Sequence, residues 1–180
     1  MRKTVIIFCL SLLCTAALSQ RQQGFYLELG GASTSVGLHY DTRFNEKTRW
    51  GGRIGIAYTY SSSEDFFDFG PQKTSGWSIP VAVNYLIGSK KHNLELGIGI
   101  SYGMYSCKKQ ANGFEVEQPR NGAFGFVDIG YRYQSSKGLM VRMGMNPGVA
   151  LGEYNEFGIK ENGVSRAAVI YPYVSVGYNF

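Results

Sequence analysis

The chain has 180 residues, of which 24 are glycine, 13 are tyrosine and only 17% are charged. Loss of Arg2 and Lys3 with the N-terminal segment described below changes 18 Lys and Arg against 13 Asp and Glu to 16 against 13, a net charge of +3. This small, scattered excess argues against a nucleic-acid-binding protein. The glycine- and tyrosine-rich composition favours strands and tight turns.

Residues 1–19 have the pattern of a cleaved signal peptide. Arg2 and Lys3 form a positive start, residues 5–13 are apolar, and Ala17-Leu18-Ser19 supplies the small residues of a cleavage site. The apolar run is shorter than the roughly 20 residues that a membrane anchor needs, and the large side chain before Cys14 is unlike a lipoprotein signal. We therefore expect residues 20–180 to form one exported domain.

Only one cysteine remains in that domain. Cys9 and Cys14 leave with the signal peptide, so Cys107 is a lone thiol and no internal disulfide is expected. Hydrogen bonding and packing must then stabilise the fold.

Eight runs in this domain alternate apolar and polar residues with the period of a β-strand. They span residues 24–31, 34–45, 49–62, 74–88, 92–106, 122–134, 138–151 and 167–180. Several are longer than the roughly 9–11 residues that a tilted strand needs to cross a membrane. Pro80 and Pro172 fall inside two runs, and each predicts a bulge or a strand end because proline cannot donate a ladder hydrogen bond.

The connections between the runs alternate in length. Those at 45–48, 89–91 and 135–137 are short, whereas those at 63–73, 107–121 and 152–166 are long. Antiparallel strands place these two sets at opposite ends, as in outer-membrane barrels with short periplasmic turns and longer extracellular loops. This orientation puts both termini in the periplasm. The first connection, 31–33, is short where a long one is expected.

Sorting each run by parity separates two unlike faces. One face is almost wholly apolar, and the other is rich in Gly, Ala and Ser, which suits the narrow interior of an eight-stranded barrel. Aromatic residues on the apolar face fall into two groups near the short-turn and long-loop ends, as two interfacial girdles require. These groups are Phe44, Trp50, Tyr85, Tyr133 and Phe180, and Tyr58, Tyr60, Trp77 and Tyr102.

Four acids and four arginines share the small-residue face. They are Glu28, Asp41, Glu95 and Asp128, and Arg43, Arg53, Arg132 and Arg142. An isolated buried charge is costly, whereas an arginine paired with a carboxylate recovers much of that cost. The balance predicts a structural ionic network in the lumen.

The last strand ends in alternating apolar residues, Val174, Val176, Tyr178 and Phe180. This pattern resembles the C-terminal assembly signal of outer-membrane β-barrels. Over residues 20–180 the chain resembles the small eight-stranded barrels of the OmpX and OmpA-transmembrane-domain type, and it is similar to the family called outer membrane protein β-barrel domain.

The resemblance implies an all-β, eight-stranded antiparallel up-and-down transmembrane β-barrel with both termini periplasmic. It also implies a location in the cell outer membrane, and we expect the protein to be a monomer. The expected partners are outer-membrane lipids, lipopolysaccharide and, during biogenesis, the barrel-assembly machinery.

The sequence offers little for catalysis. Some eight-stranded barrels modify lipid A, and those enzymes resemble one another in using a histidine with Ser or Asp near the outer leaflet. Here parity places His39 inside the barrel beside Glu28 or Asp41, and His92 in a short periplasmic turn. No metal spacing, phosphate loop or nucleophile motif is present. We therefore expect no enzyme activity and no cofactor.

The loops are the remaining candidates for a contact surface. Phe66, Phe67 and Phe69 lie among acids in the 63–73 loop and form a possible docking patch for an extracellular protein or glycan. Alternatively, these rings rest on the barrel rim. The sequence thus favours a non-enzymatic outer-membrane barrel with a structural or surface-interaction role. The alternatives are a lipid A-modifying enzyme, a narrow passive pore or, last, a soluble ligand-binding barrel.

Overall fold

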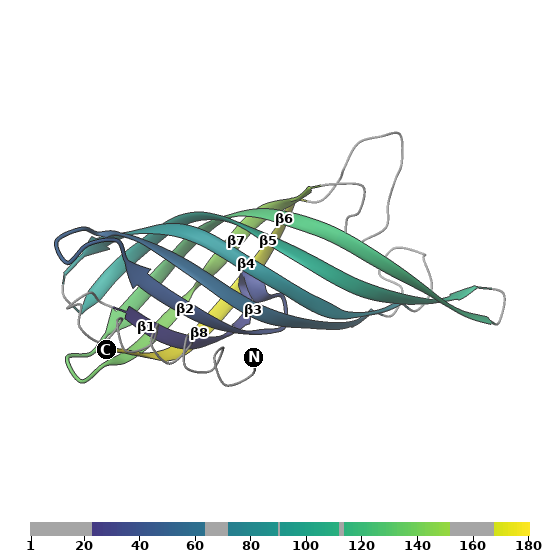
Figure 1. The fold of residues 1–180 in the computed structure, drawn as a ribbon, viewed down its shortest axis with the longest axis horizontal. Coiled ribbons are helices and arrows are strands. Elements are labelled where there is room, and N and C mark those ends of the chain that lie inside the picture. Colours follow the sequence, from purple (N-terminus) through teal and green to yellow (C-terminus); the bar gives the residue numbers. More distant parts are fainter. Residues whose placement is uncertain (1–22, 64–71, 90, 112–113, 152–167) are drawn as a thin grey trace, which may run out of the picture.

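Eight antiparallel strands form a closed barrel in chain order, with β1 paired to β8 (Figure 1). The computed structural model describes residues 23–63, 72–89, 91–111, 114–151 and 168–180. The strands are β1 (Gln23–Gly30), β2 (Val36–Arg43), β3 (Trp50–Ser63), β4 (Gln72–Gly88), β5 (His92–Ala111), β6 (Phe114–Gln134), β7 (Leu139–Leu151) and β8 (Ala168–Asn179). The all-β, eight-stranded antiparallel prediction is confirmed. The predicted signal peptide, residues 1–19, and the Phe66, Phe67 and Phe69 patch lie outside the described residues.

The outer and inner faces differ as the parity of the sequence predicts. Outward side chains such as Leu27, Ile98 and Val176 are more than half exposed, although all are large and apolar. Most inward positions are small or polar, a few such as Tyr26, Phe126 and Tyr173 carry large rings, and they are largely buried. The described part of the chain contains no helix long and apolar enough to cross a membrane.

The two prolines that were expected to distort the strands do so less than predicted. Pro80 lies inside β4 and pairs with Ser101 of β5, and no bulge forms. On the β3 side the pairing is only interrupted, because Ile54 pairs with Val81 and the same register resumes beyond the proline. Pro172 lies one residue past the last β1–β8 pair, so its missing N–H falls where β1 has already ended.

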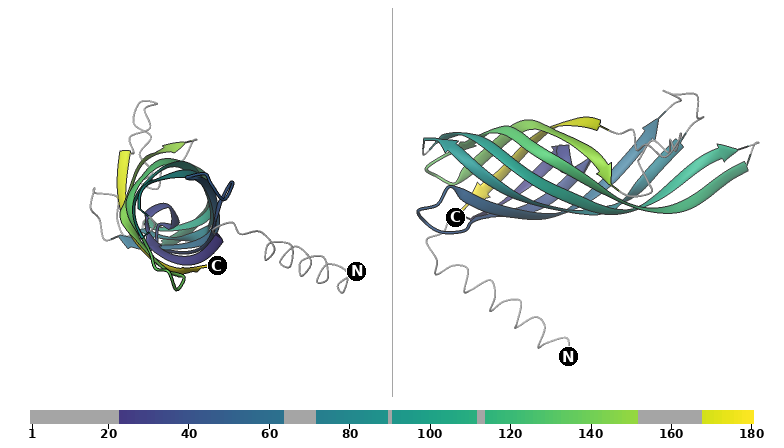
Figure 2. Two further views of the ribbon diagram at one scale, coloured as in Figure 1. Left: turned by 90° about the vertical axis from the view of Figure 1, so that its left-hand side faces the viewer. Right: turned by 90° about the horizontal axis from the view of Figure 1, so that it is seen from above.

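The connection between β1 and β2 turns into the barrel. It forms the short 3-10 helix η1 (Gly31–Ser33), which lies inside the ring of strands (Figure 2). Ala32 packs with Ala82 and Phe126, and its N–H donates to Oδ1 of Asn146 at 2.8 Å. The connection that broke the predicted alternation of loop lengths is therefore an internal plug.

The two residues that follow the plug, Thr34 and Ser35, form hydrogen bonds with β3. The Thr34 hydroxyl contacts the hydroxyl of Thr59 in β3. The Ser35 hydroxyl donates to the Tyr60 carbonyl at 3.0 Å and accepts from the Tyr60 N–H at 2.9 Å. These side chains extend the β2–β3 contacts to the two residues that immediately precede β2.

At the same end of the barrel as η1, β5 and β6 reach farthest and form a projecting ribbon (Figure 1), which β4 accompanies along β5 as far as Lys109. The predicted long loop at 107–121 is therefore wrong, because β5 reaches Ala111 and β6 begins at Phe114. Lys108 and Glu117 occupy exposed positions where the apolar pattern would require outward hydrophobic residues. The alternation of apolar and polar residues fails because this part of the ribbon lies beyond the apolar belt. We use this name for the band of exposed apolar side chains around the barrel, which on β3 runs from Trp50 to Tyr60.

The plug yields a first prediction. Gly31 has a positive φ of 58°, and a Cβ there would lie 2.6 Å from Oδ1 of Asn146 and 2.8 Å from Cβ of Tyr173. Gly31→Ala should therefore lower the free energy of unfolding by about 2 kcal/mol or more, because left-handed strain and crowding add. Urea unfolding of the refolded barrel, followed by heat-modifiable gel migration, measures this change.

The matched control is Gly52→Ala on the outer face. There the nearest atoms to an added Cβ belong to the flexible ring of Phe44, at 3.1 Å. An equal loss of stability in both variants would contradict the role assigned to the inward turn.

Candidate functional site

The structure brings all eight predicted lumen charges together. They come from six strands: Glu28 (β1), Asp41 and Arg43 (β2), Arg53 (β3), Glu95 (β5), Asp128 and Arg132 (β6), and Arg142 (β7). None of these residues is more than 4% exposed. The period of two places each side chain inward, and small neighbours on the inner face leave room for them.

Glu95 is shared by two arginines and an amide. It accepts hydrogen bonds from Arg142 Nε at 2.9 Å and Arg142 Nη2 at 3.1 Å, which form a two-pronged contact. Arg132 Nε lies 3.0 Å from its second oxygen, and Asn84 Nδ2 donates to the first at 2.7 Å. Two arginines therefore depend on one buried acid.

Arg142 extends the network toward the loop end. It donates to Glu28 at 3.2 Å and to Asp128 at 3.1 Å, in addition to Glu95. Asp128 also accepts from the Tyr173 hydroxyl at 2.8 Å. Arg53 Nη1 lies 2.7 Å from Asp128 Oδ2, in a charge contact without the alignment of a hydrogen bond.

A second group of contacts lies toward the short-turn end. Asp41 accepts from Arg43 Nη2 at 2.7 Å and from Arg132 Nη1 at 3.1 Å. The Asn84 amide bridges the two groups, because it accepts from Arg43 at 2.7 Å and donates both to Asp41 at 3.0 Å and to Glu95 at 2.7 Å. The eight charges thus form one connected system.

Aromatic faces complete the environment of the guanidinium groups. The Arg142 Cζ atom lies 4.6 Å from the ring centre of Tyr26 and 5.1 Å from that of Tyr173. Arg53 lies 5.6 Å from the ring centre of Phe126. Such contacts stabilise a cation that is removed from water. Four acids balance four arginines, so the lumen is filled by a compensated ionic core.

Sequence reasoning did not single out Asn84, Tyr26 or Tyr173. The alternation of residues could have indicated them, because all three occupy positions of their strands that face the lumen. Asn146, which holds the plug, also faces inward and is fully buried.

The histidines do not form a catalytic arrangement. His39 Nε2 lies 2.7 Å from Ser33 Oγ, whose hydroxyl donates to Glu28 at 3.0 Å, so Nε2 must be the donor to Ser33. The ring stacks on Tyr26, with 4.9 Å between ring centres. A catalytic triad requires the acid to hold the histidine and the serine to be accessible. Here the acid holds the serine, and all three groups are buried.

His92 lies at the other end, on the outside of the barrel. It is the first residue of β5 rather than part of the turn, and its Nδ1 lies 2.5 Å from the Tyr131 hydroxyl. Among the described residues, no group of His, Cys, Asp or Glu has the arrangement of a metal site.

The proposed assembly residues lie on the outer face of β8. Val174, Val176, Tyr178 and Phe180 are all exposed, and the Phe180 ring stacks on Phe25 with 6.0 Å between centres. The Phe180 N–H donates to the Gln23 carbonyl at 2.8 Å. The last residue therefore joins the first described residue at the seam that closes the barrel.

Known structures identify the architecture. No protein-family model matches the chain, and no curated protein matches its sequence. A major outer membrane protein from Thermus thermophilus superimposes with a TM-score of 0.62 at 12% identity, covering 88% of this chain and 99% of that one. The chain has the fold of a small outer-membrane β-barrel. The resemblance predicted from the sequence is therefore confirmed for the fold.

Two other outer-membrane barrels are similar to a lesser degree. The N-terminal β-barrel domain of Pseudomonas aeruginosa OprF has a TM-score of 0.47 at 9% identity, covering 89% of this chain and 96% of that one. The attachment invasion locus protein Ail of Yersinia pestis has a TM-score of 0.45 at 13% identity, with the same coverage.

The ionic core gives the second prediction. Glu95→Ala leaves Arg132 and Arg142 without their shared acid, so the free energy of unfolding should fall by about 3–5 kcal/mol. Urea unfolding of the refolded protein measures this loss. Glu117→Ala, which removes an exposed carboxylate from the ribbon, is the control and should leave the unfolding midpoint unchanged.

The same pair of proteins tests whether the lumen is closed. Neither the wild type nor Glu95→Ala should show steady, large conductance in planar bilayers, because the remaining side chains still fill the interior. Reproducible open-channel currents from the wild type would overturn the closed-lumen interpretation and favour a passive pore.

Proposed function

We propose that this protein is a non-enzymatic, integral outer-membrane barrel with a structural or surface-interaction role at its long-loop end. The observation that carries the proposal is the inside-out distribution of polarity: charged residues fill the lumen and apolar residues cover the outside. In a water-soluble barrel the arrangement would be reversed. Only a lipid environment makes this exterior favourable.

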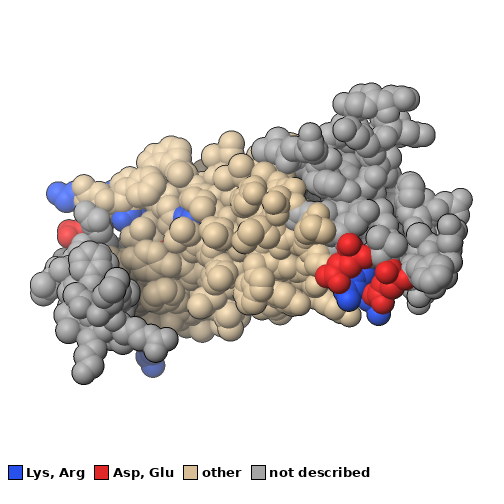
Figure 3. All heavy atoms as spheres, turned by 45° about the vertical axis from the view of Figure 1, so that its right-hand side comes forward, with Lys and Arg blue, Asp and Glu red and all other residues tan. Residues whose placement is uncertain are grey.

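The apolar exterior has the height of a membrane. On β3, Trp50 and Tyr60 are exposed and stand ten residues apart. At about 3.3 Å per residue and a tilt of about 40°, this spacing corresponds to roughly 25 Å along the barrel axis. Figure 3 shows that charged side chains on the visible face gather at the two ends and leave the middle free of them.

The polar end of the ribbon supports the proposal that the long-loop side of the barrel is exposed to water. Lys108 lies 3.6 Å from Glu117 and 3.7 Å from Glu115, and Ser106 donates to Glu117 at 2.5 Å. The hydrogen bond from Ser106, followed by the charge of Lys108, lowers the pKa of the Glu117 carboxyl. An ionised, hydrated surface projecting past the belt suits contact with lipopolysaccharide or with an extracellular protein or glycan.

The alternative functions have less support from the described geometry. A passive pore requires a free path, but η1 and the ionic core fill the lumen. A lipid-modifying enzyme requires a reactive group at the lipid surface, whereas Ser33 and His39 are enclosed. We therefore assign the role of this protein to its surface at the long-loop end.

The third prediction tests location and orientation together. In a Cys107→Ser background, Glu117→Cys should react with a bulky, impermeant maleimide on intact cells. Lys137→Cys, in a short turn, should react only after the outer membrane is permeabilised. This outcome supports periplasmic termini. The opposite labelling pattern would reverse the orientation, and recovery of the protein in a detergent-free soluble fraction would exclude the membrane location.

The fourth prediction concerns biogenesis by the barrel-assembly machinery. Phe180→Asp should strongly reduce the amount of inserted barrel in cells, because it alters the terminal recognition strand. Its effect on the urea midpoint of protein refolded in vitro should be modest, since one interfacial charge costs about 0–1 kcal/mol. Quantitative blotting of heat-modifiable protein in outer-membrane fractions measures assembly.

Phe25→Asp is the matched control. Phe25 is also exposed and lies against Phe180, but it belongs to β1. If both variants assemble equally well, or equally poorly, the terminal strand has no special role as a signal.

A further inference from the structure

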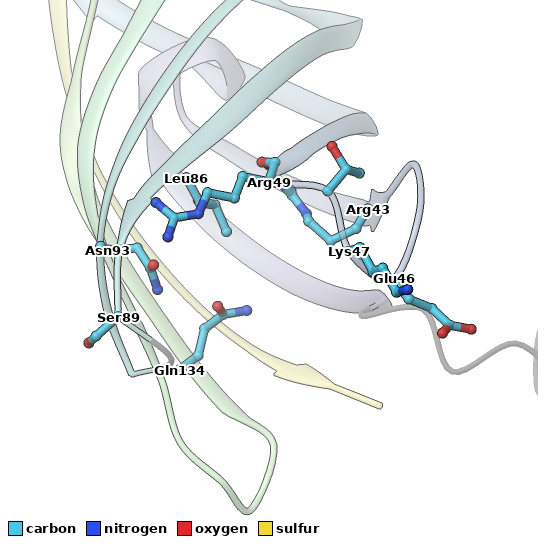
Figure 4. Close-up of a pocket in the computed structure, with 10 residues that line it drawn as sticks. Arg43, Glu46, Lys47, Arg49, Leu86, Ser89, Asn93 and Gln134 are labelled. Atoms are coloured by element: carbon cyan, nitrogen blue, oxygen red, sulfur yellow. Dashed lines mark hydrogen bonds between the residues drawn. The ribbon is translucent and has the colours of Figure 1, made fainter.

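A pocket opens at the short-turn end of the barrel, below the ionic core. It has a volume of about 390 Å³ and is formed by the β2–β3 and β4–β5 turns with the ends of β4, β5 and β6. In Figure 4, Arg49 comes from one side of the pocket and Asn93 and Gln134 from the other. The volume lies within the range of small-molecule sites, about 300–1,000 Å³.

The pocket contains a buried donor that has no protein partner. Asn93 is only 7% exposed, and its Nδ2 makes no hydrogen bond to any described residue. In Figure 4 its amide points into the pocket, as does that of Gln134. A buried amide left unpaired is costly, so this donor favours a ligand with acceptor oxygens.

The pocket also has positively charged side chains that can bind an anion. Arg43 is already committed to Asp41, but no ion pair is found for Arg49 or Lys47 within the described part of the chain. Glu46, the one acid in the lining, points away from the pocket in Figure 4. A free guanidinium beside amide donors is the usual arrangement for recognising carboxylate or phosphate.

The backbone holds Arg49 in place independently of its side chain. Its carbonyl accepts from Arg43 Nη1 at 3.2 Å and from the Leu86 N–H at 3.1 Å. The guanidinium itself is therefore not needed for the ionic core. Leu86, which is buried, adds an apolar contact to the pocket wall.

We propose that this pocket is a binding site for a small oxyanion, with Arg49 as the charged anchor and Asn93 and Gln134 as amide donors. With the orientation proposed above, the site faces the periplasm. Two sources share this chemistry: a phosphate, free or on a lipid headgroup, and the carboxylate of a peptide terminus.

The test uses the mature protein, ¹⁵N-labelled and refolded in detergent micelles at constant ionic strength. Inorganic phosphate, glycerol 3-phosphate and N-acetylalanine are titrated separately, and NMR follows the side-chain signals of Asn93, Gln134 and Arg49. Saturable shifts at these groups support the site. Preference for the two phosphates assigns a phosphate ligand, and preference for N-acetylalanine assigns a peptide carboxylate.

Two variants separate the pocket from general charge attraction. Arg49→Gln should weaken binding by about tenfold or more, as expected for loss of a charge-assisted hydrogen bond. Lys137→Gln removes the same charge from the neighbouring turn and should change affinity by less than about twofold, because exposed charges outside the pocket are screened. Heat-modifiable migration confirms that each variant is folded.

Two results would overturn the proposal. One is the absence of saturation with all three probes up to about 10 mM, tenfold above a weak millimolar Kd. The other is an equal loss of affinity in Arg49→Gln and Lys137→Gln. Neither result affects the labelling experiment on orientation, since binding in micelles does not depend on which side of a membrane the pocket faces.

Discussion

Charge compensation inside a narrow barrel is the constraint on which the rest of this structure depends. Eight strands leave an interior that side chains must fill, and here ionised side chains fill much of it. Each buried charge is tolerable only if its partner is placed within hydrogen-bond reach. Glu95 and Arg142, which contact several partners each, therefore fix the relative register of strands that are not neighbours.

The inward turn of η1 closes the system from the loop side. Ser33 donates to Glu28, and Ala32 fills the space beside Phe126, so the ionic core is separated from the loop-side end by packed chain. This arrangement also explains why β1 and β2 are short. Their connection is part of the barrel interior, while β5 and β6 extend into the space beyond the belt.

Periodicity predicted most of the fold because a closed barrel with two unlike faces imposes a strict rule on every strand. Leu27 faces outward and Glu28 faces the lumen, and a shift of one residue would exchange them. The rule does not apply outside the belt, which is why the sequence predicted a loop at 107–121 where β5 and β6 continue. It also gives no information about a connection such as 31–33, whose conformation depends on Asn146 of β7, far away in the sequence.

The ionic core could be anticipated by residue type but not by pairing. Parity places Arg53 and Asp128 in the lumen, yet only the shear of the closed barrel decides that they meet. Tyr26 was overlooked because its neighbours Phe25 and Leu27 dominate the pattern. The pocket at the turns escaped sequence reasoning for a similar reason: Arg49 and Asn93 belong to different hairpins, and the barrel alone brings them together.

The long sequence separation within the core has a kinetic consequence. Arg142 in β7 meets Glu28 in β1, 114 residues earlier in the chain. A sheet that has not yet closed would hold Glu28 without this partner, in a setting where an unpaired charge is strongly unfavourable. Half-formed barrels should therefore be short-lived, and closure should be cooperative and slow, as is typical of topologies dominated by distant contacts.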